Sequence, residues 1–346
     1  MPDLSEEYLL ANTRELFGVD GLAAVRFTRG ADKEASAYRI VGSGHAYFLK
    51  VRRAPVTRGA LLFQRAAADR VPEVIAPITG RDGELSQSFG EFQAILYPFV
   101  EGTDAFATAL EDSQWCALGR AVRAIHEAPI APEITRRLRI ETLAPAWRVR
   151  ARAHFARSAD VRPKDESARR LLAKLRAHHD TVSRIVERAE TLGERMCTKS
   201  LPTVVCHGDL HAGNVLVRRN GGIAIVDWDD PTFAARERDL MFIGGGVGDV
   251  WNRRHEVDAF YRGYGDICVD PEALAYYRYE RIVEDTVLFC DELLASDGDH
   301  AERALTLHWF SGQFNAQGVV AMADEAYARL RARAAVCPKA SASPSE

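Results

Sequence analysis

Several features of common protein classes are missing from this 346-residue sequence. Its six cysteines are scattered without a Cys-x-x-Cys pair, which predicts reduced, partly buried thiols. The N-terminal stretch is acidic and has no apolar signal segment, and no apolar run is long enough to span a membrane. The net charge of −4 gives no overall basic field for nucleic acid. We therefore expect a cytoplasmic globular protein that needs no membrane.

Lysine is scarce, because most of the 45 basic residues are arginine. A lysine inside an apolar strand-like run is therefore informative, and Lys50 lies in such a run at residues 47–51. A second absence concerns the glycines at 244–248. They do not fit the G-x-G-x-x-G spacing, and no strand–helix unit surrounds them, which argues against a dinucleotide fold.

The stretch at residues 204–229 organises the rest of the chain. Short β-branched runs at 215–217 and 223–226 flank Asn-Gly-Gly at 220–222, which is a turn signal. The predicted order is loop, strand, hairpin turn, strand and loop. This order sets three polar side chains at the ends of paired strands, namely Asp209, Asn214 and Asp227.

These three residue types match the needs of phosphoryl transfer from a nucleotide. One carboxylate orients the attacking hydroxyl, while an amide oxygen and a second carboxylate hold Mg²⁺ against the phosphates. Asp209 and Asn214 are five residues apart, as are the catalytic Asp and metal-binding Asn of protein kinases. The pattern predicts Asp209 as catalytic residue and Asn214 with Asp227 as metal ligands.

Two other interpretations of this stretch remain open. It could be a polar loop with a helix cap. His207, Asp209 and His211 could instead form a metal-hydrolase cluster, although such sites usually draw further ligands from elsewhere and no second dense cluster is present.

The segments HGDLHAGN at 207–214 and IVDWDD at 225–230 resemble the catalytic and metal motifs of the aminoglycoside phosphotransferases. That superfamily shares the protein-kinase-like fold and includes choline and homoserine kinases. The strings at 237–252 and 276–285 resemble one subgroup, the 9-O-phosphorylating spectinomycin phosphotransferases. The resemblance covers about residues 5–325.

The resemblance implies an α+β, bilobal protein-kinase-like fold. An antiparallel β small lobe that binds the nucleotide is expected at residues 1–97. A mostly helical large lobe with the catalytic loop and the substrate pocket is expected at 98–333, followed by a disordered tail at 334–346. The large lobe should contain an Arg-rich helical insertion at about 134–196. An RNA-binding face there is an alternative, but interleaved aromatic residues are lacking.

The resemblance also implies how ATP and Mg²⁺ would be bound. Lys50 takes the place of the strand lysine that meets the α- and β-phosphates, under a loop at 30–36 in which Ser36 is a candidate phosphate contact. The hinge at 97–102 would hold the adenine, with Phe99 and Val100 in contact with it. The helix expected at 58–69 has no acid facing Lys50 until Asp69, so the acidic partner of the lysine is not identified.

Acidic and aromatic residues of the segment 249–285 are the candidates for binding a cationic substrate. If 272–290 is helical, several of these side chains share one face, although they could equally pair with nearby arginines. The candidate substrate residues are Asp249, Trp251, Tyr264, Glu280, Glu284 and Asp285.

Taken together, these features predict an ATP- and Mg²⁺-dependent O-phosphotransferase that acts on an aminocyclitol antibiotic such as spectinomycin and thereby confers resistance. Two alternatives stay open. One is a metabolite kinase of the same fold, of the choline or homoserine type. The other is a catalytically weak nucleotide-binding protein, against which the complete set of Asp209, Asn214 and Asp227 argues.

Overall fold

The structure is a computed structural model that describes residues 4–27, 35–53, 56–158, 160–248, 250–295 and 299–336. The chain forms two compact units. The first consists of Met1–Glu141, Val204–Ala234 and Ala259–Gly265. The second consists of Thr142–Thr203, Ala235–Asp258 and Asp266–Glu346. Both contain helices, and the sheets lie in or border the first unit, so the fold is α+β as predicted.

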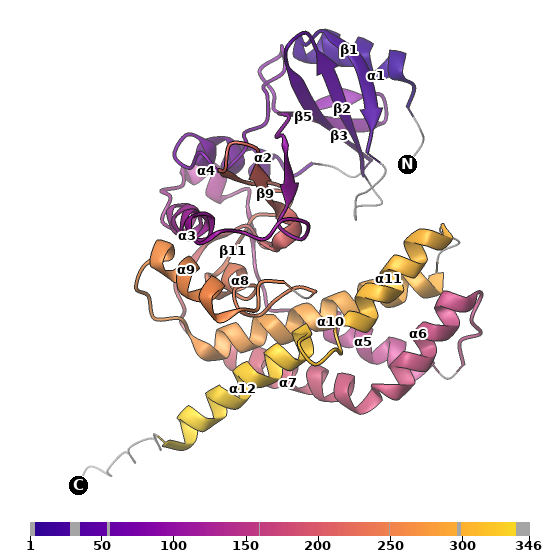
Figure 1. The fold of residues 1–346 in the computed structure, drawn as a ribbon, viewed down its shortest axis with the longest axis vertical. Helices are drawn as coiled ribbons and strands as arrows, with labels where there is room; N and C mark the ends of the chain where they lie inside the picture. Colours follow the sequence, from indigo (N-terminus) through magenta and orange to yellow (C-terminus); the bar gives the residue numbers. More distant parts are fainter. Residues whose placement is uncertain are drawn as a thin grey trace. The chain divides into compact units, whose positions relative to one another are not determined.

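A five-stranded antiparallel sheet forms one part of the first unit (Figure 1). Its strands lie in the order β1 (Gly21–Arg26), β2 (Ala35–Gly42), β3 (Ala46–Arg52), β5 (Phe92–Pro98) and β4 (Gln87–Phe89). The resemblance correctly predicted an antiparallel sheet. The sequence did not predict β4, because a three-residue strand is too short for alternation to be recognised.

The alternation along β2 and β3 decides which side chains face the core. Tyr38, Ile40, Leu49 and Val51 are buried in one apolar cluster. Because successive side chains of a strand point to opposite faces, the neighbours of these residues lie on the other face. That second face carries Lys50 and Arg52 of β3, paired across the ladder with Ala37 and Ala35.

Helices complete the first unit. Helix α1 (Glu6–Asn12) continues as a π-helical turn (Thr13–Phe17), and α2 (Arg58–Ala68) and α3 (Asp112–His126) follow along the chain, with a short α4 (Pro132–Thr135). Leu118, Val122 and Ile125 of α3 are buried, as their spacing predicts. His126, predicted as a hydrogen-bonding core residue, is buried and its Nδ1 lies 2.7 Å from the Tyr264 hydroxyl.

Two small sheets also belong to this part of the chain. One contains β10 (Ile223–Ile225), β9 (Val215–Arg218) and β6 (Gly102–Asp104), in that order. The other contains β7 (Arg139–Ile140), β11 (Thr232–Ala235) and β8 (Thr203–Cys206). The β9–β10 hairpin and β8 carry the loops of the candidate site.

The second unit is mainly helical. It contains α5 (Ala146–Arg157), α6 (Glu166–Ala177), α7 (His179–Cys197), α8 (Glu237–Leu240), α10 (Pro271–Ala295), α11 (His300–Gly312) and α12 (Val319–Val336). Helix α9 (Arg254–Tyr264) has residues in both units. The long helix α10 packs against α5, α7, α11 and α12 (Figure 1).

The helical insertion predicted at 134–196 is present as α5, α6 and α7. Its apolar stripe is buried, as expected from the helical spacing of Leu171, Leu172, Leu175, Val182, Ile185, Val186, Ala189 and Leu192. Helix α12 extends to Val336, three residues into the tail predicted as disordered. The rest of that tail, residues 337–346, lies outside the described residues. In the described part of the chain, no helix is long and apolar enough to cross a membrane.

Candidate active site

The loop before β9 and the loop after β10 lie together at the open end of the β9–β10 hairpin. The strands pair antiparallel, with Ile225 opposite Val215, and the Asn-Gly-Gly turn closes through a hydrogen bond from Arg218 N–H to Gly222 O at 2.8 Å. A further bond from Val226 N–H to Asn214 O, at 3.0 Å, joins the loop before β9 to the loop after β10. The predicted order of loop, strand, turn, strand and loop is therefore present.

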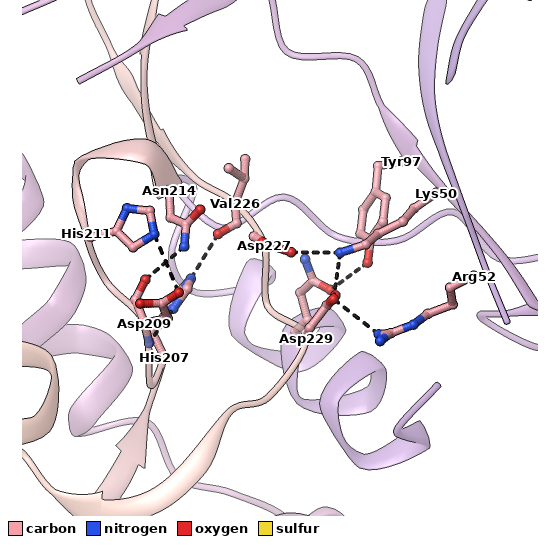
Figure 2. A network of polar contacts seen from close by, with 11 residues as sticks. Lys50, Arg52, Tyr97, His207, Asp209, His211, Asn214, Val226, Asp227 and Asp229 are labelled. Carbon is pink, nitrogen blue, oxygen red and sulfur yellow. Dashed lines mark hydrogen bonds and ion pairs between the residues drawn. The ribbon is translucent and has the colours of Figure 1, made fainter. Parts of the chain in front are cut away.

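Asp209 lies in the loop after β8, surrounded by two histidines (Figure 2). Its backbone N–H donates to Nδ1 of His207 at 3.3 Å, and one carboxylate oxygen is 3.5 Å from Nε2 of His211. About half of its side chain is exposed (44%). A carboxylate held by its backbone but open to solvent can accept a hydrogen bond from an incoming hydroxyl.

The two histidines orient the loop through both of their ring nitrogens. His207 Nε2 lies 2.9 Å from Val226 O, and its Nδ1 accepts from Asp209. His211 Nδ1 accepts from Gly213 N–H at 2.9 Å, which turns its Nε2 toward Asp209. Since both nitrogens of each ring already have partners, the geometry argues against the metal-hydrolase interpretation of this cluster.

Asn214 and Asp227 present oxygen atoms on neighbouring loops. The Asn214 amide nitrogen donates to Asp209 O at 2.8 Å, which leaves its side-chain oxygen to face a ligand. Burial raises the pKa of the Asp227 carboxyl, but Lys50 and His207 lower it by more, so the group is an anion at neutral pH. An amide oxygen and a carboxylate are the ligands that a hard cation such as Mg²⁺ prefers, so this pair fits the ion.

Asp227 also has an unusual backbone. Its φ of 64° lies in the left-handed region, which asparagine and aspartate tolerate better than most side chains. Trp228 follows it and is buried, with its indole N–H donating to Ile225 O at 3.0 Å and its ring 4.5 Å from that of His207. The anchored tryptophan fixes the turn that directs Asp227 and Asp229 to the same side.

Lys50 reaches both of these carboxylates (Figure 2). Its Nζ lies 2.8 Å from Asp227 and 2.6 Å from Asp229, and Arg52 lies 3.1 Å from the same oxygen of Asp229. Burial lowers the pKa of the Lys50 ammonium, but the two carboxylates raise it by more, so the lysine stays charged. The acidic partners of Lys50 thus come from the loop after β10.

Helix α2 contributes no acid, in agreement with its sequence, which contains neither Asp nor Glu. It provides Gln64 instead. The amide nitrogen of Gln64 donates to Ile75 O at 2.7 Å, and its oxygen lies 3.3 Å from the Tyr97 hydroxyl. Burial, with Asp229 and Asp227 nearby, raises the pKa of Tyr97 well above its ordinary value, so this phenol remains a neutral donor.

Ser36 does not lie with Lys50. It sits in β2 opposite Val51, and residues directly opposite in an antiparallel pair share a face, so its side chain is on the core face of the sheet. It is buried, and its Oγ accepts from Arg26 at 3.3 Å. The resemblance suggested a phosphate contact because Ser36 ends the loop expected at 30–36, but β2 already begins at Ala35. Residues 30–34 of that loop lie outside the described residues.

Phe99 and Val100 follow β5 in the predicted hinge, and both are half-buried. The Phe99 N–H donates to Ala46 O at 3.0 Å, so this backbone donor is already used. The Phe99 ring stacks with Phe27 (6.2 Å between centroids) and lies 4.3 Å from the Arg39 guanidinium carbon. Phe27 also contacts Phe48, which shares a face of β3 with Lys50. Phe27 and Phe48 are not among the residues predicted for the site, although Phe48 could have been found from the alternation along β3, which places it on the face of Lys50.

A cavity of about 820 Å³ borders the hinge as well. It is lined by Phe99, Val100 and Glu101 together with residues 72, 74–79 and 218–220. Neither Lys50 nor the catalytic-loop residues line it. We therefore do not assign the nucleotide phosphates to this cavity, since their candidate ligands lie elsewhere.

Two of the acids proposed for the substrate are paired with arginines within the second unit. Glu280 lies 3.2 Å from Arg148, with both side chains nearly buried, and Asp285 lies 2.8 Å from Arg281. Each is therefore already neutralised by an intramolecular cation. Glu284 is half-buried on the same helix, one turn after Glu280. The sequence correctly placed these residues on a helix but could not identify Arg148, which comes from α5.

The aromatic candidates are core residues. Trp251 and Tyr264 are 2% and 1% exposed, so neither ring has an exposed face on which a substrate could stack. Trp251 has a φ of 63°, and its carbonyl accepts from Gly244 N–H at 3.0 Å, which closes the loop between them. Asp249 lies outside the described residues.

Arginines of the predicted insertion mostly have acidic partners in the same unit. The ion pairs include Arg150 with Asp291, Arg152 with Glu190, Arg184 and Arg188 with Asp324, and Arg195 with Glu272. Paired guanidinium groups contribute little positive field toward a polyanion. These ion pairs reduce the net positive charge of the surface that the RNA-binding alternative requires.

Comparison with known proteins agrees with the geometry. The sequence model described as the phosphotransferase enzyme family matches residues 27–277. The chain belongs to this family. It is similar to spectinomycin phosphotransferase APH(9)-Ia, whose structure is known in complex with ADP and spectinomycin, at 34% identity over 94% of this chain and 99% of that one, with a TM-score of 0.87. The AMP complex of that enzyme gives 33% identity and a TM-score of 0.83, over 93% and 99% of the two chains.

More distant solved structures share the fold alone. An aminoglycoside phosphotransferase from Alicyclobacillus acidocaldarius has 15% identity and a TM-score of 0.60, over 97% of this chain and 98% of its own. None of the curated proteins matches the sequence. The resemblance to aminoglycoside phosphotransferases, and to their spectinomycin branch in particular, is confirmed, as is the kinase-like fold.

Proposed function

We propose that this phosphotransferase uses ATP and Mg²⁺ to phosphorylate a hydroxyl of spectinomycin and thereby confers resistance to the drug. The observation that carries the proposal is the similarity to spectinomycin phosphotransferase over nearly the whole chain, at 34% identity. Fold alone would not suffice, because folds of this kind serve many substrates.

Asp209 is the proposed catalytic residue. Its carboxylate is half exposed and its backbone is fixed by His207 and Asn214, so it can orient a hydroxyl and accept its proton as the bond to phosphorus forms. His211, 3.5 Å away, keeps this carboxylate in place. We assign both histidines to positioning.

Asn214 and Asp227 would hold the metal ion, and Lys50 would meet the nucleotide phosphates. Bound Mg²⁺ neutralises charge that develops on the transferred phosphoryl group. The residues of this chain bind and orient the nucleotide, and transfer would depend mainly on positioning and charge stabilisation. The half-buried hinge residues Phe99 and Val100 are proposed to contact the adenine.

The acids of the second unit are the candidates for binding the amines of the substrate. Spectinomycin is a rigid fused-ring aminocyclitol with two secondary amines, so its pocket requires carboxylates. Glu280 and Asp285 already balance arginines. We propose Glu284, which is half-buried on α10 one turn after Glu280, as an amine-binding residue, and the loop at 244–251 as the segment that limits the length of the ligand.

A phosphotransfer screen tests this function. The protein is incubated with labelled ATP, Mg²⁺ and, separately, spectinomycin, kanamycin, choline and homoserine, with the Asp209→Asn variant as the background control. Label on spectinomycin is the expected result. Label on choline or homoserine alone would favour a metabolite kinase of the same fold, and label on none of them would reject the proposal.

A further inference from the structure

In protein kinases a glutamate of the helix after the lysine strand pairs with the lysine. Helix α2 has no such acid, and the contacts of Lys50 show which carboxylates pair with it instead. Two cations of β3 face two carboxylates of the loop after β10, and the contacts are Lys50 with Asp227, Lys50 with Asp229, and Arg52 with Asp229. Lys50 and Arg52 are two residues apart on one strand, so they share a face. Opposite them in β2 are alanines, which leave this face to the charged groups.

Asp229 differs from Asp227 in its surroundings. A single oxygen of Asp229 contacts both Lys50 and Arg52, and its side chain is 28% exposed against 48% for Asp227. Asp227 also adjoins Asn214 through the bond from Val226 N–H to Asn214 O, which places it with the other candidate metal ligand. The more exposed carboxylate faces the metal site, and the less exposed one ties the two cations together.

We propose that Asp229, held by Arg52, is a positioning residue that fixes the Lys50 ammonium for the nucleotide phosphates when Asp227 is engaged by the metal. It takes the place of the absent acid on α2, where Gln64 is occupied by Ile75 and Tyr97. The proposal rests on the proposed nucleotide-dependent function and deepens it.

The charges explain why one carboxylate is not enough. Lys50 and Arg52 repel each other, and Asp229 is the anion that both contact. When a cation binds Asp227 and Asp229 is present, the two positive groups Lys50 and Arg52 still have the carboxylate of Asp229 between them. Their net charge is then +1, which suits the phosphates. Without it, Asp227 would be the remaining carboxylate partner of Lys50 among the described residues, and the lysine would compete with the metal ion for it.

This competition gives a specific expectation for the Asp229→Asn variant. The dissociation constant of ADP in the presence of Mg²⁺ should rise by about 10–100-fold, the scale of one lost hydrogen bond to a charged group, because the Lys50 ammonium is no longer held for the phosphates. The Mg²⁺ concentration at half-maximal ADP binding should rise as well. Arg52→Gln should cause a smaller change in the same direction, because it loosens Asp229 without removing it.

The test is calorimetric binding of ADP over a series of Mg²⁺ concentrations, with no turnover required. Asp230→Asn is the matched control, since this neighbouring carboxylate pairs with Arg139. Each variant is combined with Lys50→Met. If Asp229 acts through the lysine, adding Asp229→Asn to the Lys50→Met variant should not weaken ADP binding further. Thermal unfolding of each variant checks that it is folded.

Three results would overturn the proposal. The first is unchanged ADP and Mg²⁺ binding in folded Asp229→Asn. The second is an equal loss with and without Lys50, which would mark Asp229 as a metal ligand or a structural residue. The third applies if Asp229→Asn does not fold and therefore cannot be measured. In that case, ADP and Mg²⁺ binding of Arg52→Gln equal to that of the unmutated protein would overturn the proposal. If one of these results is found while the unmutated protein binds ADP with Mg²⁺, only the role of Asp229 is rejected and the proposed function stands. If the unmutated protein binds no nucleotide, both the role of Asp229 and the proposed function are rejected.

Discussion

Arg148 and Glu280 form a nearly buried ion pair at 3.2 Å, with side chains 5% and 13% exposed. Arg148 also donates to Leu143 O at 2.9 Å. Removing one partner of a buried pair leaves an uncompensated charge, which typically costs about 3–5 kcal/mol. We therefore expect Glu280→Gln to lower the free energy of unfolding by about that amount, measured by urea titration.

Two further variants show whether Glu280 serves stability or substrate binding. Glu302→Gln, on an exposed position of α11, should leave unfolding unchanged. Glu284→Gln should instead raise KM for spectinomycin with a smaller effect on unfolding. A large rise in KM for folded Glu280→Gln, without loss of stability, would return this residue to the substrate site.

Asp227 combines a metal-facing carboxylate with a left-handed backbone, at φ 64°. Because asparagine also tolerates this conformation, Asp227→Asn tests the charge without adding backbone strain. We expect it to lower Mg²⁺-dependent turnover by at least about 100-fold, since the metal supplies several kcal/mol of charge stabilisation. The measurement is kcat over a Mg²⁺ titration, and full activity in excess chelator would reject the metal assignment.

Asp270 stabilises the start of α10. It accepts from the backbone N–H groups of Glu272 and Ala273 at 2.9 and 2.8 Å and lies 2.6 Å from Lys199. Burial raises the pKa of Asp270, but the lysine and the helix amides lower it by more. Its contribution is therefore present above the unfolded pKa of about 3.9 and lost as the pH falls through the lower folded value.

The corresponding variants separate the cap from the charge. Asp270→Asn keeps a good N-cap and should lose only the ion pair, while Asp270→Ala should lose both and be less stable at pH 7 by a further ~1 kcal/mol. The difference between parent and Asp270→Ala should shrink as the pH falls below about 4. Unfolding curves from pH 3 to pH 7 check this, and a difference that grows in acid would contradict it.

Asp209 is expected to act on kcat rather than on nucleotide binding. Its backbone is held by His207, and its carboxylate lies 3.5 Å from Nε2 of His211. Asp209→Asn should lower kcat by about 10²–10⁴-fold, the usual scale for a positioned acid–base group. ADP affinity should change little. Turnover within about threefold of the parent would remove Asp209 from the catalytic role.

The catalytic loop and hairpin could be predicted because their residues lie within one stretch of 26 positions. The turn at 220–222, the β-branched runs and the spacing of Asp209 and Asn214 are local features, and local geometry follows from them. The predicted strands β2, β3 and β5 follow from alternation in the same way.

The partners of Lys50 could not be predicted, because Asp229 is 179 residues away along the chain. The same holds for Glu280 and Arg148, which lie on different helices. Helical periodicity placed Glu280 on one face of α10 but does not show what packs there. Trp251 and Tyr264 were assigned to the substrate from residue type, whereas their burial depends on tertiary packing.

The most direct test of the account is steady-state kcat/KM for phosphoryl transfer from ATP with Mg²⁺ to spectinomycin and to kanamycin. The proposed pocket suits a compact fused-ring substrate, so we predict a preference for spectinomycin of at least about 100-fold. Comparable efficiency on kanamycin would contradict the specificity. Absence of transfer to spectinomycin by protein that phosphorylates another substrate would contradict the proposed function itself.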